Sequence, residues 1–200
     1  KQIENSNSHK KSWLILSLVS NLGILVFYKY YNFLNENISF IADFLGFENH
    51  IPALDIILPI GLSFHTFQAM SYTIEVYRGK QQAEKNLLNY SLYVLYFPQL
   101  VAGPIERPQE LLPQLKKPFQ FDYSNLTSGL FRISIGFFKK VVIADRLALF
   151  VDPVYSNLSE HNGLSILLAT VFFAFEIYCD FSGYTDIALG TSRMMGITLM

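Results

Sequence analysis

Three carboxylic acids and one arginine follow directly behind a long apolar run. In the stretch EIYCDFSGYTDIALGTSRMMG they are Glu176, Asp180, Asp186 and Arg193, and the fifteen residues before them carry no acidic or basic side chain. The two acids Glu176 and Asp180 are four residues apart and share one face if a helix runs through them. Asp186 and Arg193 are seven apart, again nearly on one face. Such groups can line a polar path or tie helices together, whereas a helix that ends before them would leave them solvated.

The sequence lacks the spacings of the common catalytic and metal sites. Its four histidines are widely separated along the chain: His9, His50, His65 and His161. A single cysteine, Cys179, cannot form a disulfide or a thiolate metal cluster within the chain. Ser182 has no histidine nearby in the sequence to activate it as a nucleophile, and we expect a structural role for His65. We therefore predict no metal site and no bound cofactor.

The composition indicates a membrane protein. Hydrophobic residues make up 51% of the 200 residues and charged residues 16%, against about 25% in soluble proteins. The net charge of −1 gives no reason to expect nucleic acid as a partner, and membrane lipid is the partner that the apolar surface predicts.

Four runs without acidic or basic side chains are candidate membrane segments: Trp13–Tyr28, Ile56–Ile74, Asn86–Ile105 and His161–Phe175. A spanning helix needs about 20 apolar residues, so the shorter runs must extend into their polar flanks. We predict an all-α, polytopic helical membrane bundle. The alternative, a buried helical core of a large soluble protein, fits the aromatic flanks and basic loops less well.

The third run is interrupted and need not be a simple crossing. Lys10 and Lys11 place the start of the first run in the cytoplasm by the positive-inside rule. Within residues 88–105, Pro98 and the Gly103-Pro104 pair suit a broken or re-entrant element that enters the membrane and turns back. A proline-kinked crossing is the alternative.

Residues 122–155 read as helical, with Asp122 or Ser124 as the N-cap. Within that stretch we interpret the charged residues as one side of an interfacial helix that faces lipid headgroups: Lys139, Lys140, Asp145 and Arg146. The next residues, 157–163, read as a turn.

Small residues recur at four-residue spacing behind the last apolar run, at Ala188, Ser192 and Gly196. Such a stripe lets two helix backbones approach closely in a membrane. We expect it to face a neighbouring helix.

Three stretches together resemble the membrane-bound O-acyltransferase (MBOAT) family: PIGLSFHTFQAMSYTIEVYRG, YFPQLVAGPIERPQELLPQL and EIYCDFSGYTDIALGTSRMMG. They lie in order over residues 59–196 and are most similar to the bacterial alginate O-acetyltransferase branch, with the D-alanyl transfer protein of teichoic acid as a relative. The resemblance implies a multi-pass enzyme of the cytoplasmic (inner) membrane. It would move an acyl group, commonly acetyl, onto hydroxyls of an extracellular or cell-envelope polysaccharide.

The same resemblance implies the other participants. The acyl donor, acetyl-CoA or an acyl carrier, is a substrate, and a periplasmic or extracellular acyltransferase protein is the expected partner. The family's catalytic histidine usually follows a tryptophan, as Trp-His-Gly, well after the DFSGY motif. Here Trp13 is followed by Leu14, and the position of His65 more often holds an aromatic residue in the family. We assign no catalytic residue and expect residues 1–200 to be part of a single transmembrane acyltransferase domain, truncated at both ends.

Seven polar residues are predicted to line or brace the funnel that such helices surround: Gln68, Gln99, Arg107, Asp180, Tyr184, Asp186 and Arg193. Two other classes of function compete with the enzyme. A transporter would also use broken helices and intramembrane acids, but it should show repeated halves, and the sequence contains no internal repeat. A scaffold protein would need no polar lining.

The uncharged runs predict that the protein, expressed in bacteria, stays in the membrane fraction after extraction with alkaline carbonate. Recovery mainly in the soluble fraction would contradict the membrane assignment.

Overall fold

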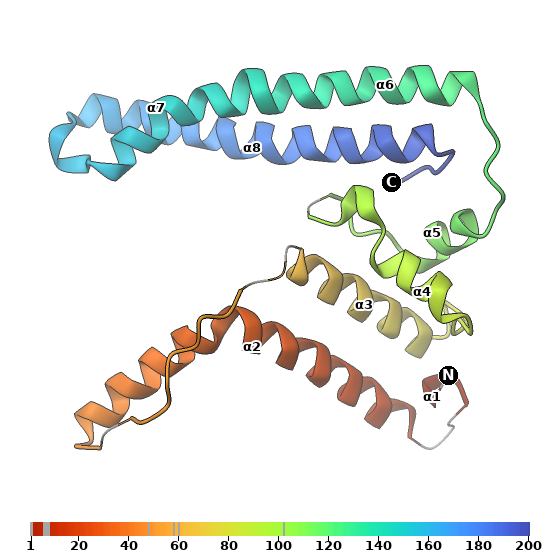
Figure 1. The fold of residues 1–200 in the computed structure, drawn as a ribbon, viewed down its shortest axis with the longest axis horizontal. Helices are drawn as coiled ribbons and strands as arrows, with labels where there is room; N and C mark the ends of the chain where they lie inside the picture. The colour runs from red at the N-terminus through yellow and green to blue at the C-terminus, as the bar shows by residue number, and fades with distance from the viewer. Residues whose placement is uncertain (1, 6–8, 48, 58, 60, 102) are drawn as a thin grey trace. The chain divides into compact units, whose positions relative to one another are not determined.

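The computed structural model describes residues 2–5, 9–47, 49–57, 59, 61–101 and 103–200. Over these residues the chain forms helices and no strand, which confirms the all-α prediction (Figure 1). The chain divides into two compact units, one of Lys1–Leu95 with Arg107–Gln109 and the other of Tyr96–Glu106 with Glu110–Met200. We describe each unit by itself.

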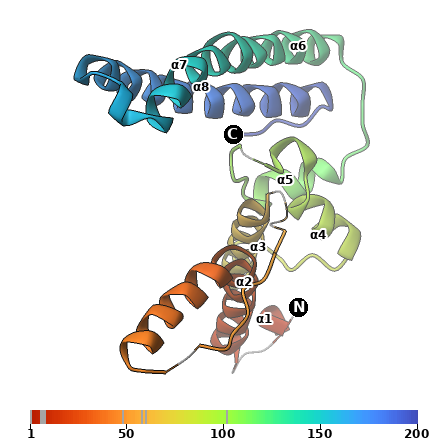
Figure 2. The ribbon, with the colours of Figure 1, turned by 60° about the vertical axis from the view of Figure 1, so that its left-hand side comes forward.

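The first unit contains four helices: α1 (Gln2–Asn5), α2 (Lys10–Phe44), α3 (Leu62–Tyr77) and α4 (Leu87–Val94). Figures 1 and 2 both show α2 bent near its middle. Its first half packs against α3, with the hydroxyls of Ser17 and Thr73 3.5 Å apart. Aromatic rings join α3 to α4, since the Tyr72 ring lies 4.9 Å from that of Tyr90.

In the second predicted membrane segment, Ile56–Ile74, α3 begins at Leu62, and the described residues before it (56, 57, 59 and 61) are not helical, so the prediction of one continuous span is wrong for them. Asparagine side chains hold the preceding segment, residues 49–57, along the second half of α2. The amide of Asn35 donates to the Ile51 carbonyl at 3.0 Å, and that of Asn32 to the Leu54 carbonyl at 2.8 Å. These bonds satisfy backbone groups that a helix would otherwise pair internally.

The third predicted segment is broken. Asn86 caps α4 by accepting from the Leu88 N–H at 2.9 Å, and the α-helix ends at Val94. Pro98 then falls within the short 3₁₀ turn η1 (Phe97–Gln99), because a proline there cannot continue an α-helix without a clash one turn back. Thus the segment is not one kinked helix, and its re-entrant course stays a prediction.

The second unit is built on a long helical hairpin. Its helices are α5 (Pro108–Leu115), α6 (Tyr123–Phe137), the π-helical segment η2 (Phe138–Ala144), α7 (Asp145–Ser156), the 3₁₀ turn η3 (Leu158–Glu160) and α8 (Gly163–Met194). The predicted cap of α6 is confirmed, since Asp122 accepts from the Ser124 N–H at 2.8 Å. Asn162 caps α8 in the same way through the Ser165 N–H, also at 2.8 Å.

Helices α6 and α8 run antiparallel and side by side in both views (Figures 1 and 2). Two pairs of glycines meet across them, Gly129 with Gly190 and Gly136 with Gly183. A Cβ on Gly136 would stand 2.6 Å from the Gly183 carbonyl oxygen, and one on Gly129 2.7 Å from that of Gly190. The backbones therefore touch where only glycine leaves room.

The predicted small-residue stripe has a different neighbour. Ala188 and Ser192 are buried, and Ala188 lies against the loop that contains Gly103. Gly196 lies after the end of α8 with open space around it. The stripe thus holds a loop, while glycines on another face of α8 meet α6.

Among the described helices, α2 and α8 are long and apolar enough to cross a membrane. Helix α2 contains the whole first predicted run, and α8 contains the fourth from Gly163 onward. With 32 residues, α8 is about 48 Å long at about 1.5 Å per residue, more than the ~30 Å hydrocarbon core. The helix therefore continues through all four charged residues of the DFSGY stretch.

The glycine contacts predict that Gly136→Ala destabilises the complete protein by about 1–3 kcal/mol, because the added methyl group forces α6 and α8 apart. Gly23→Ala is the matched control, since a Cβ at this helical glycine of α2 meets nothing within 4 Å. It should be neutral or slightly stabilising. Thermal unfolding in detergent measures both, and equal midpoints would contradict the contact.

Candidate functional site: a polar strip on helix α8

Asp186 lies at the centre of the contact between α6 and α8, and both of its carboxylate oxygens are used. Arg132 of α6 donates to Oδ1 at 3.0 Å, and Lys139 of η2 donates to Oδ2 at 2.6 Å. The Asp186 side chain is only 14% exposed. Because each carboxylate oxygen of Asp186 binds a cation from α6 or η2, the side chain joins these segments firmly to α8.

Asp180 makes a second tie, nearer the surface. Its carboxylate accepts from the ammonium of Lys140 at 2.6 Å, and the same ammonium reaches Asp145 at 3.0 Å. The Asp180 side chain is 54% exposed, so solvent screens this pair more than it screens Asp186.

The charged side chains of this region pair across helices and not along one helix. Arg193, seven residues after Asp186, is exposed and forms no ion pair with the residues that the structure describes. Seven residues along a helix separate two side chains by about 10 Å, whereas α6 brings cations into direct contact. Lys139 and Lys140 turn to α8 and not to lipid headgroups, for the same reason.

Ser182, considered above as a nucleophile, also belongs to this strip. Its hydroxyl accepts from Lys139 at 2.9 Å. A lysine ammonium has donors but no acceptor, so while Lys139 is bound to Asp186 it cannot take the serine proton. This arrangement supports a structural tie.

Tyr184 binds the loop after η1, two residues beyond Gln99. The hydroxyl of Tyr184 accepts from the Val101 N–H at 3.3 Å, which fixes the loop on α8. Gln99 is buried at the base of that loop. Gln99 and Tyr184 are 85 positions apart in the sequence (184 − 99), and both lie at this loop.

Beside Arg107, which is exposed, the structure buries a residue that the sequence analysis did not select. Glu106 is 1% exposed and accepts from the Met200 N–H at 2.7 Å. Burial raises the pKa of its carboxyl, and the Met200 N–H opposes that shift. An acid flanked by prolines in GPIERP is the only sequence signal for this contact.

The remaining predicted residue, Gln68, lies in the first unit. It is buried on α3, one turn after His65. We therefore report it apart from the strip on α8.

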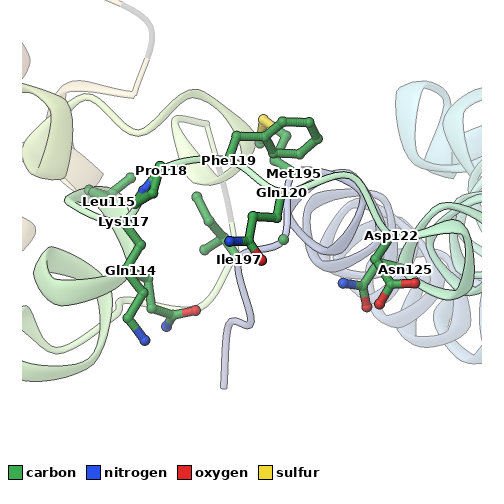
Figure 3. A pocket seen from close by; sticks show the side chains of 11 residues that line it. Gln114, Leu115, Lys117, Pro118, Phe119, Gln120, Asp122, Asn125, Met195 and Ile197 are labelled. Carbon is green, nitrogen blue, oxygen red and sulfur yellow. The ribbon is translucent and has the colours of Figure 1, made fainter.

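An open cavity of about 800 Å³ lies beside the start of α6 (Figure 3). The end of α5, the following loop and the residues after α8 line it, among them Gln114, Lys117, Phe119 and Ile197. None of the seven predicted residues is in this lining. This cavity and the polar strip are thus different places.

In chemical terms the strip supplies hydrogen-bond donors and acceptors without a nucleophile–base pair. No group of three or more histidine, cysteine or acidic side chains among the residues searched could hold a metal ion. What the strip offers is a polar, internally paired face along a helix that is long and apolar enough to span a membrane.

The chain is 35% identical to a peptidoglycan O-acetyltransferase of Helicobacter pylori over 96% of this chain and 41% of that protein. It is 38% identical to a probable alginate O-acetylase AlgI of Pseudomonas aeruginosa over 94% of this chain and 36% of that protein. A teichoic acid D-alanyltransferase of Bacillus subtilis is 27% identical over 75% of this chain and 38% of that protein.

The chain therefore spans about two fifths of the length of the curated relatives that it matches. The sequence profile of one family covers residues 83–200, which include the broken segment, the helical hairpin and the polar strip. On that match, the chain belongs to the membrane-bound O-acyltransferase family.

Proposed function

We propose that the protein is a membrane-bound O-acetyltransferase that acts on hydroxyl groups of an extracellular or cell-envelope polysaccharide. The observation that carries this proposal is the similarity, over nearly the whole chain, to relatives named as O-acetylating enzymes of two different glycans. In the reaction the acyl carbon leaves its donor and forms an ester with a sugar hydroxyl, whose proton passes to a base. The donor, acetyl-CoA or an acyl carrier, is bound as a substrate.

The acceptor is a sugar polymer in either case. Peptidoglycan and alginate, the glycans in the relatives' names, both present hydroxyls on a chain of sugar rings. D-alanyl transfer to teichoic acid is the second candidate, and the lower identity of 27% to the enzyme with that name makes it the weaker one.

The polar strip then has two roles. Asp186 and Asp180 brace the hairpin, because their oxygens are occupied by cations of the same protein. Gln99 and Tyr184, at the loop after η1, are the better candidates for lining a path. Multi-pass insertion in the inner membrane and a periplasmic or extracellular acyltransferase as partner complete the proposal.

Disruption of the chromosomal gene tests the function. We expect ester-linked acetate to fall severalfold on one envelope or extracellular polysaccharide and to return when the complete protein is supplied. Acetate released by mild alkali from purified peptidoglycan and exopolysaccharide measures this. Unchanged acetate on both polymers would contradict the proposal, and a loss of D-alanine esters from teichoic acid would favour the second candidate.

The bracing role predicts unequal effects of two identical substitutions. Asp186→Asn leaves two cations without their carboxylate and should lower the stability by more than the about 0–1 kcal/mol of an exposed pair, towards the about 3–5 kcal/mol of a buried one. Asp180→Asn, at the more exposed site, should cost about 0–1 kcal/mol.

Thermal unfolding in detergent and polymer acetylation should be measured on both variants of the complete protein. Bracing predicts that Asp186→Asn lowers the stability and the activity together. If Asp186→Asn loses activity but keeps wild-type stability, Asp186 is instead a lining residue. If both variants match the wild type in stability and activity, the strip is a solvated surface.

A further inference from the structure

Gln99 has a feature that bracing does not explain. Its side chain is 5% exposed, and its carbonyl oxygen, Oε1, has no hydrogen-bond partner within the described part of the chain. A buried acceptor that has lost water without gaining a donor costs free energy, so most such groups in proteins are paired. The Gln99 oxygen is therefore open to a donor from outside the described residues.

The backbone around Gln99 is held on several sides. The Gln99 N–H donates to the Tyr96 carbonyl at 3.2 Å, and the Val101 N–H binds the Tyr184 hydroxyl at 3.3 Å. Gly103, with a φ of +127°, lies so close that an added Cβ would be 3.5 Å from the Cβ of Gln99 and 3.9 Å from that of Ala188. The oxygen therefore belongs to a packed side chain and not to a loose one.

A second buried polar group flanks the turn. Tyr96, the N-cap residue of η1, is 3% exposed, and its carbonyl accepts from the Gln99 N–H at 3.2 Å. Its hydroxyl turns towards Ser192 of α8 but forms no hydrogen bond of ordinary geometry with a described residue. The Ser192 hydroxyl instead donates to the Ala188 carbonyl at 2.8 Å.

These two groups complement one kind of ligand. The Gln99 oxygen only accepts a hydrogen bond, and a tyrosine hydroxyl can donate one. Together they suit a group that carries a donor beside an acceptor, namely a hydroxyl or a secondary amide.

We propose that Gln99 and Tyr96 form a substrate-positioning site, in which the Gln99 carbonyl binds the O–H or N–H of a substrate. This inference rests on the proposed function. The donor group can come from a sugar hydroxyl of the acceptor or from an amide of a CoA-type acyl donor. The kinetics of the two substrates distinguish these sources.

The test is Gln99→Met in the complete protein, because methionine keeps the length of the side chain and removes the amide. Removal of an unpaired buried carbonyl should leave the thermal midpoint unchanged or raise it. The same substitution should lower kcat/KM at least about tenfold, which is the effect expected from the loss of one well-placed hydrogen bond to substrate. A raised KM for acetyl-CoA assigns the contact to the donor, and a raised KM for alginate or peptidoglycan fragments assigns it to the acceptor.

Gln114→Met is the matched control, since the Gln114 amide is paired with the Thr198 N–H at 2.8 Å and the Thr198 carbonyl at 3.0 Å. That variant should lose stability. If Gln99→Met loses stability as Gln114→Met does, the Gln99 oxygen has a partner within the protein and the inference is wrong.

Tyr96→Phe removes a single hydroxyl and provides a second arm, with the same expected fall in kcat/KM at unchanged stability. Wild-type kinetics in both variants would also overturn the inference. If the wild-type protein itself transfers no acyl group, the proposed function is wrong. If the wild type is active and both variants have wild-type kinetics, only the proposed site at Gln99 and Tyr96 is wrong.

Discussion

The contact between the backbones of α6 and α8 is the constraint on which the second unit depends. Where Gly136 meets Gly183, no side chain separates the two helices. The approach leaves little room for water, and a charge pair is stronger where water is excluded. It also sets the register that brings Arg132 and Lys139 to Asp186. The ion pairs are therefore a consequence of the glycines, and either feature alone would hold the hairpin less firmly.

Six charged residues of this hairpin form a neutral set. Three cations from α6 and η2 meet three acids, and every one of the six takes part in an ion pair: Arg132, Lys139, Lys140, Asp145, Asp180 and Asp186. A neutral set is less costly to keep in apolar surroundings than any single charge. The π-helical segment that carries both lysines fits this purpose, since its wider turn changes the direction in which consecutive residues point. In a membrane acyltransferase such a hairpin can form a rigid wall beside a path for substrates.

Local signals in the sequence were sufficient for much of the fold. Asp122 was predicted to cap its helix and does so, and the break near Pro98 follows from proline geometry. The partners of Asp186 could not be predicted from local signals, because they lie on α6 and η2. The spacing of residues along α8 carries no information about side chains on other helices. A usable signal existed in the seven-residue spacing of the glycines on both helices. Glu106 was missed because its contact with Met200 spans most of the second unit.

The central claim is that Asp186, behind the last apolar run, is tied to α6 and η2 and is not solvated. A double-mutant cycle of Lys139→Met and Asp186→Leu tests it most directly, with the free energy of unfolding measured in detergent for the wild type, both single variants and the double variant. The account predicts a coupling energy of about 1–3 kcal/mol between the two residues. Asp186→Leu leaves the ammonium of Lys139 without its carboxylate, Lys139→Met removes one of the two cations bound to Asp186, and the double variant removes both members of the pair. Additive effects, with a coupling energy of zero within error, would contradict it.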